Sequence, residues 1–263
     1  MKVALFQWDL CWEDPEANYE KMVSLLERER PEPGTFCVFP ETASTGFTMA
    51  FDQVATEVDG AYEKQLTALS DRFECPLFVG LARKYPEGVR NEALTFLPGA
   101  GPVHRYAKVQ PFALGGELEV VIPGDRLFLF EYGGFTICPL ICYDLRFPEW
   151  FREGARLGAE VFVVIASWPE KRHHHWQLLL QARAIENQAY VLGVNRCGED
   201  PHFQYRGGSM IIDPLANAVQ EAGEEEAVLK GELDRESLRQ WREGFPALTD
   251  CRHQSAGAGL ERS

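Results

Sequence analysis

Cys142 has the residue type and the position of a nucleophile. It ends an apolar run, 137–141, that is typical of a buried strand, and a helix is expected to begin near Pro148. Such a strand-to-helix corner exposes a side chain and offers backbone N–H groups to an anion. We expect the helix start and nearby cations to lower the pKa of this thiol. A buried core cysteine, or a redox or metal pair with Cys138, fits the same segment, although no second Cys/His pair follows at the spacing of zinc ligands.

Two charged residues could assist such a nucleophile. Glu41 directly follows the apolar run 36–39, and ligands of α/β proteins collect beyond the carboxyl ends of strands. A glutamate at that point could act as a general base. Lys108, within 106–112, could hold positive charge beside a developing oxyanion. Taken singly, Glu41 is better explained as a solvated loop residue and Lys108 as a surface lysine.

Other reactive patterns in the sequence are weaker. His173, His174 and His175 are consecutive, so on a helix they point in different directions and cannot all bind one metal ion. The Gly-x-Ser-x-Gly motif of serine hydrolases is absent. The segment 207–209 is rich in glycine but lacks the spacing of a phosphate-binding or dinucleotide-binding loop. We therefore predict no metal site.

Composition limits the class of protein. The 263 residues include 45% hydrophobic ones, enough for a substantial core, and the formal net charge of −14 makes nucleic acid a poor partner. No apolar run approaches the ~20 residues of a membrane-spanning helix, and the N-terminus does not resemble a signal peptide. The seven cysteines are odd in number and irregularly spaced, so reduced thiols and a cytoplasmic location are expected.

Hydrophobic periodicity predicts the elements that must position these residues. Strands and helices alternate early and late in the chain, with paired strands between, which favours an α/β domain with parallel and antiparallel pairing. No linker divides the chain, so a single domain, 1–263, with a tail at 249–263, is predicted. Helices are expected at 16–29, 61–73, 148–157, 173–188 and 235–243. Strands are expected at 2–8, 36–39, 77–82, 91–97, 127–131, 135–141, 161–165, 190–195, 205–212 and 228–233.

Glu41, Lys108 and Cys142 stand in the order of the catalytic residues of the nitrilase, or carbon-nitrogen hydrolase, superfamily, which the chain resembles from residue 2 to about 233. The resemblance implies a four-layer α-β-β-α sandwich with mixed sheets, in which each of the three residues follows a strand. It also implies a second glutamate, for which Glu117 and Glu119 compete. The similar motifs are Phe39-Pro40-Glu41, Tyr106-Ala107-Lys108 and the segments 142–149 and 181–187.

Within this superfamily the chain looks most similar to the omega-amidase branch. The similar segments are 142–148, 167–169, 175–177 and 185–190, whereas 109–112 departs from the pattern expected after the lysine. Members of this branch hydrolyse the side-chain amide of 2-oxo dicarboxylic acid monoamides such as 2-oxoglutaramate. Other activities of the superfamily are the alternatives: N-carbamoyl amino acid hydrolase, deaminated glutathione amidase or nitrilase. A catalytically inactive binding protein on the same fold is another.

The resemblance implies an amidase that forms a thioester on Cys142, releases ammonia and needs no metal or organic cofactor. Glu41 would take the thiol proton as sulfur attacks the amide. Lys108 and the backbone N–H of Tyr143 would hold the oxyanion. Glu117 would orient Lys108 or the hydrolytic water.

Two further residues could bind the substrate. Arg146, four residues after Cys142, could hold a substrate carboxylate in a bidentate fork, or it could brace an acidic residue of the fold. Trp168 could line the acyl pocket or pack in the core. By analogy with the family we expect a homodimer or a larger homo-oligomer. The expected partner is a small-molecule amide, with no role for nucleic acid or a membrane.

Overall fold

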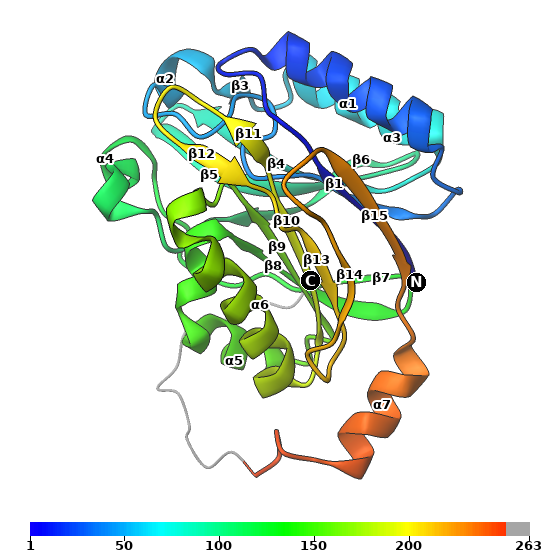
Figure 1. Ribbon diagram of the computed structural model, residues 1–263. Helices are drawn as coiled ribbons and strands as arrows, with labels where there is room; N and C mark the ends of the chain where they lie inside the picture. Colours follow the sequence, from blue (N-terminus) through cyan, green and yellow to red (C-terminus); the bar gives the residue numbers. More distant parts are fainter. Residues whose placement is uncertain (251–263) are drawn as a thin grey trace.

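The computed structural model describes residues 1–250 and contains two mixed β-sheets that pack face to face between helices (Figure 1). In the first sheet the strand order is β15-β1-β2-β4-β5-β6, with β3 paired to β4. Strands β1, β2 and β4 are parallel, whereas β15, β5 and β6 join antiparallel. The strands are β1 (Lys2–Gln7), β2 (Phe36–Val38), β3 (Thr56–Glu57), β4 (Leu77–Tyr85), β5 (Gly88–Leu97), β6 (Gly101–Ala107) and β15 (Ala227–Glu232).

The second sheet repeats this plan around its own parallel centre. Its order is β14-β13-β10-β9-β8-β7, in which β8, β9 and β10 are parallel and the other strands join antiparallel. Parallel strands bring their carboxyl ends to one edge of a sheet, where side chains can meet. The strands are β7 (Phe130–Tyr132), β8 (Phe135–Ile141), β9 (Val161–Ala166), β10 (Tyr190–Asn195), β13 (Met210–Ile212) and β14 (Ala218–Glu221), beside a separate hairpin of β11 (Cys197–Glu199) and β12 (Gln204–Arg206).

Helices cover the outer faces of both sheets. Figure 1 shows α1 and α3 on the side of the first sheet and α5 and α6 on the side of the second. This is the four-layer α-β-β-α sandwich that the family resemblance implied, so that prediction is confirmed. The helices are α1 (Pro15–Glu29), α2 (Phe51–Val54), α3 (Ala61–Phe73), α4 (Glu117–Val120), α5 (Pro148–Arg156), α6 (His173–Asn187) and α7 (Arg235–Gly244), with 3₁₀ turns η1 (Ala113–Gly115), η2 (Cys142–Arg146) and η3 (Glu170–Arg172).

Alternation along β1 shows how one strand serves two layers. Val3 and Leu5 belong to the core between the two sheets, whereas Ala4 and Phe6 belong to a second core that includes residues of α1 and α3. Successive side chains of a strand point to opposite faces, so one apolar strand can fill both cores. The apolar run 3–6 within β1 follows from its burial on both sides.

The strand predicted over 205–212 is wrong in one respect, because the chain forms two strands there. Gly207 and Gly208 separate β12 from β13 with φ values of 59° and 72°. Glycine enters this left-handed region without the steric cost that other residues incur. Strands β6 and β14 were not predicted, because apolar alternation is weak in both.

The predicted tail at 249–263 lies outside the described residues beyond Asp250, so a single domain with a tail stays a prediction. The last described residues form a turn after α7, in which the N–H groups of Thr249 and Asp250 donate to Pro246 and Ala247. Within residues 1–250, none of the helices combines the length and the apolar character needed to cross a lipid bilayer.

Candidate active site

Glu41 lies just beyond the carboxyl end of β2 and is fully buried. Its Oε2 accepts a hydrogen bond from the backbone N–H of Ser167 at 2.8 Å. Its Oε1 accepts from Asn91 Nδ2 and from Lys108 Nζ, also at 2.8 Å each. Strand β4 passes so closely that a Cβ atom on Gly80 would lie 2.6 Å from the Glu41 Cα. Only glycine fits beside the backbone of Glu41, and this close approach holds Glu41 against β4.

Lys108 directly follows β6, and its ammonium joins two carboxylates. Nζ donates to Glu41 Oε1 and to Glu117 Oε2, at 2.8 Å in each case, and the residue is only 2% exposed. Burial by itself lowers the pKa of the Lys108 ammonium, but the carboxylates of Glu117 and Glu41 more than offset this effect. The pKa is therefore raised, and the side chain keeps its positive charge.

Glu117 is the second glutamate that reaches Lys108. It is fully buried in the first turn of α4, and its carboxylate also accepts from the backbone N–H of Phe112 at 2.6 Å and from Asn91 Nδ2 at 2.9 Å. Glu119, the competing candidate, is exposed to solvent. The geometry therefore favours Glu117 for the positioning role.

Cys142 stands where β8 turns into η2, with a φ of 47° that is sterically unfavourable for a residue with a Cβ atom. Its Sγ atom lies 4.0 Å from the carbonyl oxygen of Ser167 and also interacts with the Glu41 carboxylate. Burial raises the pKa of the thiol, Glu41 raises it further, and Lys108 opposes this only in part. The prediction of a lowered thiol pKa is therefore wrong, because burial and two carboxylates outweigh one ammonium.

Asp144 connects the lysine segment to the nucleophile corner. Its carboxylate accepts from the backbone N–H groups of Ile141 at 2.8 Å and Gln110 at 2.9 Å, and from the Tyr106 hydroxyl at 2.7 Å. Burial raises the pKa of this carboxyl group to about 7 against the effect of these donors. Since Gln110 and Tyr106 flank Lys108 in the chain, Asp144 holds the segment that carries the ammonium against the one that carries the sulfur.

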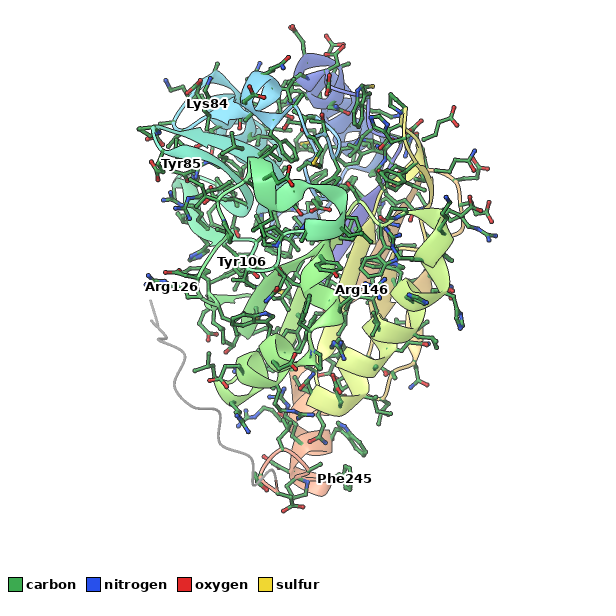
Figure 2. All side chains as sticks on the ribbon, turned by 90° about the vertical axis from the view of Figure 1, so that its left-hand side faces the viewer. Lys84, Tyr85, Tyr106, Arg126, Arg146 and Phe245 are labelled. Atoms are coloured by element: carbon green, nitrogen blue, oxygen red, sulfur yellow. The ribbon has the colours of Figure 1, made fainter. Side chains whose placement is uncertain are left out.

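A pocket opens at Cys142, and its wall is mostly aromatic. The ring of Tyr143 lies 5.0 Å from that of Phe112, between ring centroids, and both rings line the pocket. Among the described residues that line it, only Arg146 and Arg172 carry a formal charge. Figure 2 looks onto this side of the molecule and labels Arg146 beside α6. The pocket thus combines a thiol, an apolar wall and two cations.

The Arg146 guanidinium has no carboxylate partner within residues 1–250. It lies over the ring of Trp168, 4.8 Å from the centroid, and its Nη2 is 3.3 Å from His175 Nδ1. Trp168 is 2% exposed and packs against Trp176 while it also lines the pocket. The described structure therefore offers nothing for Arg146 to brace, and Trp168 contributes to both the core and the pocket.

Two residues of the site, Asn91 and Arg172, were not predicted from the sequence. Asn91 is 1% exposed in β5, and its one amide group donates to both Glu41 and Glu117. A polar residue within a strand gives no local signal of such a role. Arg172 sits in η3, four residues after Trp168, and that neighbouring motif was the only pointer to it in the sequence.

The three consecutive histidines do not form a metal site in the part of the chain that the structure describes. His173 begins α6, and His174 and His175 are exposed on it. Within residues 1–250 there is no group of three or more His, Cys, Asp or Glu side chains arranged to hold a metal ion.

Known proteins resemble this chain over almost its whole length. The family model for carbon-nitrogen hydrolases matches residues 2–243. Omega-amidase YafV of Yersinia enterocolitica is 36% identical over 252 residues, which cover 95% of this chain and 96% of that protein. The 2-oxoglutaramate amidase of Bacillus subtilis (strain 168) is 32% identical over 95% of this chain and 97% of that enzyme.

A solved structure shows the same fold. The protein from Xanthomonas campestris, described as a CN-hydrolase superfamily protein with an arsenic adduct in the active site, superposes with a TM-score of 0.91 at 30% identity. The superposition covers 98% of this chain and 99% of that one.

Proposed function

The chain belongs to the carbon-nitrogen hydrolase family, and on this premise we propose that it is an omega-amidase that releases ammonia from 2-oxo dicarboxylic acid monoamides such as 2-oxoglutaramate. Relatives with such names are 32% and 36% identical over nearly the full length. The observation that carries the proposal is the pocket itself. It joins the thiol of Cys142 to a wall with two guanidinium groups and no carboxylate among its described residues, which suits an amide with an anionic far end.

The first step forms a thioester. Because the thiol of Cys142 is protonated in the free enzyme, Glu41 takes its proton as sulfur attacks the amide carbon. The oxyanion is held by the Lys108 ammonium and the backbone N–H of Tyr143, and losing one such donor typically raises the barrier by about 3 kcal/mol. The C–N bond then breaks, and protonated Glu41 gives its proton to the departing nitrogen, which leaves as ammonia.

The second step hydrolyses the thioester. Glu41, again ionised, takes a proton from a water molecule as that water attacks the thioester carbon. The C–S bond breaks, and the sulfur of Cys142 recovers its proton from Glu41. Glu117 keeps Lys108 in place through both steps, because its carboxylate accepts a 2.8 Å hydrogen bond from the Nζ atom of Lys108. We assign it a positioning role because Lys108 lies between it and Glu41.

Replacement of the thiol tests the nucleophile. Cys142→Ala is expected to abolish ammonia release from 2-oxoglutaramate while leaving the circular dichroism spectrum and the melting temperature close to those of the wild type. Cys138→Ala is the matched control, because Cys138 lies four residues earlier on β8, is fully buried and lines no part of the pocket. Turnover by Cys142→Ala would refute the thioester route.

A substrate panel tests the branch of the family. Ammonia release from 2-oxoglutaramate should exceed that from an N-carbamoyl amino acid or a nitrile of similar length. Arg146→Ala should raise KM for the anionic amide far more than for a neutral amide, because it removes a guanidinium from the pocket wall. Faster turnover of the carbamoyl compound or the nitrile would favour those alternatives instead.

We also propose that the protein is a homodimer or a larger homo-oligomer. Leu178 and Ile185 are 51% and 55% exposed on α6 and stand seven residues apart, so they share one face of the helix. We propose that this face of α6 contacts the partner subunit, where both side chains would be removed from water. Light scattering coupled to size exclusion measures the molar mass, and a monomer at micromolar concentration would contradict this proposal.

A cytoplasmic location is proposed from the cysteines. The six cysteines within residues 1–250 are all free thiols, as expected for a reducing compartment. Fractionation of the producing cells, with a cytoplasmic marker enzyme followed in parallel, tests this location.

A further inference from the structure

The pocket holds a second arginine, Arg172, to which the family resemblance gave no role. Arg172 reaches the pocket from η3, just after β9, whereas Arg146 reaches it from η2, just after β8. The two guanidinium groups therefore come from different elements and meet at one wall. Each of them is partly buried.

Aromatic side chains hold the two arginines in place. The Arg172 guanidinium lies 5.3 Å from the centroid of the Phe112 ring, and the Arg146 guanidinium lies 4.8 Å from that of Trp168. The indole N–H of Trp168 in turn donates to the backbone carbonyl of Arg172 at 2.7 Å. Trp168 thus positions both residues, and neither needs an acidic partner to stay ordered.

The charges around these arginines are unusual for so acidic a chain. The protein has 40 acidic and 26 basic residues, yet neither guanidinium has a carboxylate partner in the described part of the chain. Both guanidinium groups line the same pocket, where their like charges repel one another, and burial and the charge of Arg172 both lower the pKa of the Arg146 guanidinium. A bound anion would relieve this repulsion.

We infer that Arg146 and Arg172 form one anion subsite, in which Arg172 is a specificity-determining residue for amides that end in a 2-oxo carboxylate. This inference rests on the proposed amidase function and names the substrate end that the pocket recognises. Two guanidinium groups offer more N–H donors than a single carboxylate can accept. The 2-oxo oxygen beside the carboxylate can take the donors that remain, so the pair favours 2-oxo acids over simple acids.

Three amides of equal chain length separate these contributions: 2-oxoglutaramate, glutaramate without the oxo group, and neutral pentanamide. We compare kcat/KM for the three in the wild type and in Arg172→Gln. The wild type should prefer 2-oxoglutaramate over glutaramate, and glutaramate over pentanamide. In Arg172→Gln, the kcat/KM for 2-oxoglutaramate divided by the kcat/KM for pentanamide should fall about 10- to 100-fold, as expected for the loss of a charge-assisted hydrogen bond.

Lys171→Gln is the matched control. Lys171 is the neighbouring residue in η3, is exposed and does not line the pocket, so it removes one positive charge without touching the subsite. Arg146→Gln combined with Arg172→Gln should lower the same ratio by less than the product of the two single effects, because both side chains hold one group. An unchanged ratio in Arg172→Gln, or a fully multiplicative double variant, would overturn the inference.

A binding measurement keeps the inference separate from the proposed function. The product dianion, 2-oxoglutarate, should protect Cys142 of the wild type from alkylation by iodoacetamide, and this protection should weaken in Arg172→Gln but not in Lys171→Gln. If protection follows this pattern while 2-oxoglutaramate is not hydrolysed, the amidase proposal fails and the anion subsite stands. If 2-oxoglutaramate is hydrolysed but protection is equal in all three proteins, the subsite fails and the amidase proposal stands.

Discussion

The charge around the Cys142 sulfur determines how the reaction has to begin. One ammonium, Lys108, lies between two buried carboxylates, Glu41 and Glu117, and a thiolate would add a third negative charge to this cluster. The raised pKa of the thiol follows from burial and from this arrangement of charges. The free enzyme therefore keeps a neutral thiol, and the proton leaves only when an acceptor and an electrophile are both present.

Glu41→Gln should lower the pKa of the Cys142 thiol and abolish ammonia release at the same time. Among the charges that raise this pKa, that of Glu41 has the largest effect. A neutral glutamine removes this charge, while Lys108 continues to favour the thiolate. The pH midpoint of Cys142 alkylation should fall by about one pH unit or more. Turnover stops because glutamine cannot accept the proton.

Mass spectrometry of the labelled peptide measures the alkylation rate at each pH. Glu119→Gln, an exposed glutamate on the same short helix as Glu117, serves as the control and should leave the midpoint unchanged. A midpoint that stays constant or rises in Glu41→Gln would mean that another group governs the thiol.

Asn91 is a residue of the site that sequence patterns cannot predict. Its amide nitrogen bridges Glu41 and Glu117 at 2.8 and 2.9 Å, and its backbone carbonyl accepts from the N–H of Lys108 at 2.9 Å. The three partners are distant in sequence or lie in loops, so the asparagine looks like any polar residue of β5. Only the folded chain brings these groups together.

Asn91→Ala should lower kcat by roughly 10- to 100-fold with little change in KM, because the loss of a hydrogen bond to a charged group costs about 1.5–3 kcal/mol and no substrate contact is removed. Steady-state kinetics with 2-oxoglutaramate measure both constants. Asn187→Ala is the control: Asn187 is equally buried, but its amide donates to the backbone carbonyl of Arg183 on α6 and not to a carboxylate of the site. Equal loss of kcat in both variants would reduce Asn91 to a structural residue.

Helices and strands were predicted best where the sequence signal was local. The strand over Phe135–Ile141 and the helix over Ala61–Phe73 have the predicted bounds, because a tight glycine turn starts the first and an apolar stripe marks the second. The strand over 205–212 failed at Gly207, whose left-handed backbone depends on the whole chain's path. Lys108 was a candidate from its charge, but only the family resemblance favoured a catalytic role over a surface lysine, since the strand before it was not recognised.

The pairing of β2 with β4 sets the position of the general base. The N–H of Gly80 donates to the carbonyl of Pro40 at 3.2 Å, and the carbonyl of Gly80 accepts from the N–H of Ala43 at 2.7 Å. Strand β4 is therefore hydrogen-bonded to the chain both before and after Glu41. A Cβ atom at this glycine would lie 2.6 Å from the Pro40 carbonyl oxygen as well as from the Glu41 Cα. Both neighbours are backbone atoms, which cannot rotate away.

Gly80→Ala should therefore displace Glu41 and reduce kcat/KM by about 100-fold, the effect expected of a displacement near 1 Å. The folding cost of overpacking should be about 1–3 kcal/mol, measured by urea denaturation. Gly223→Ala provides the comparison, because its added Cβ would meet no atom within 4 Å. Wild-type activity in Gly80→Ala would show that the loop tolerates the shift and that the contact does not set the base.

The two ends of the sandwich have different roles. Cys142 and Ser167 follow the carboxyl ends of β8 and β9, where the pocket opens. Helix α7 docks at the opposite ends of the parallel strands. Arg242 donates to the carbonyl of Ala159 at 2.7 Å and to that of Gln188 at 2.8 Å, just before β9 and β10 begin.

Removal of α7 should therefore separate stability from catalysis. A chain that ends at Leu233 keeps β15, which pairs with β1 along six residues. It loses Leu238, which is 1% exposed and belongs to the same core as Val3 and Leu5. The free energy of unfolding should fall by about 2–5 kcal/mol, as for other large truncations of buried leucine. The kcat/KM for 2-oxoglutaramate should persist at temperatures where the chain is folded, since no pocket residue is removed.

The matched comparison is a chain that ends at Asp250, because both shortened proteins then lack residues 251–263 and differ only in α7 and the turn after it. Thermal unfolding and kinetics at 25 °C are measured on both. Arg242→Met in the full chain tests the same docking contact without truncation and should lower the melting temperature in the same direction, because two carbonyl groups lose their donor. Loss of kcat/KM at an unchanged melting temperature would mean that α7 acts on the pocket, and the two ends of the sandwich would then have to be treated as one coupled unit.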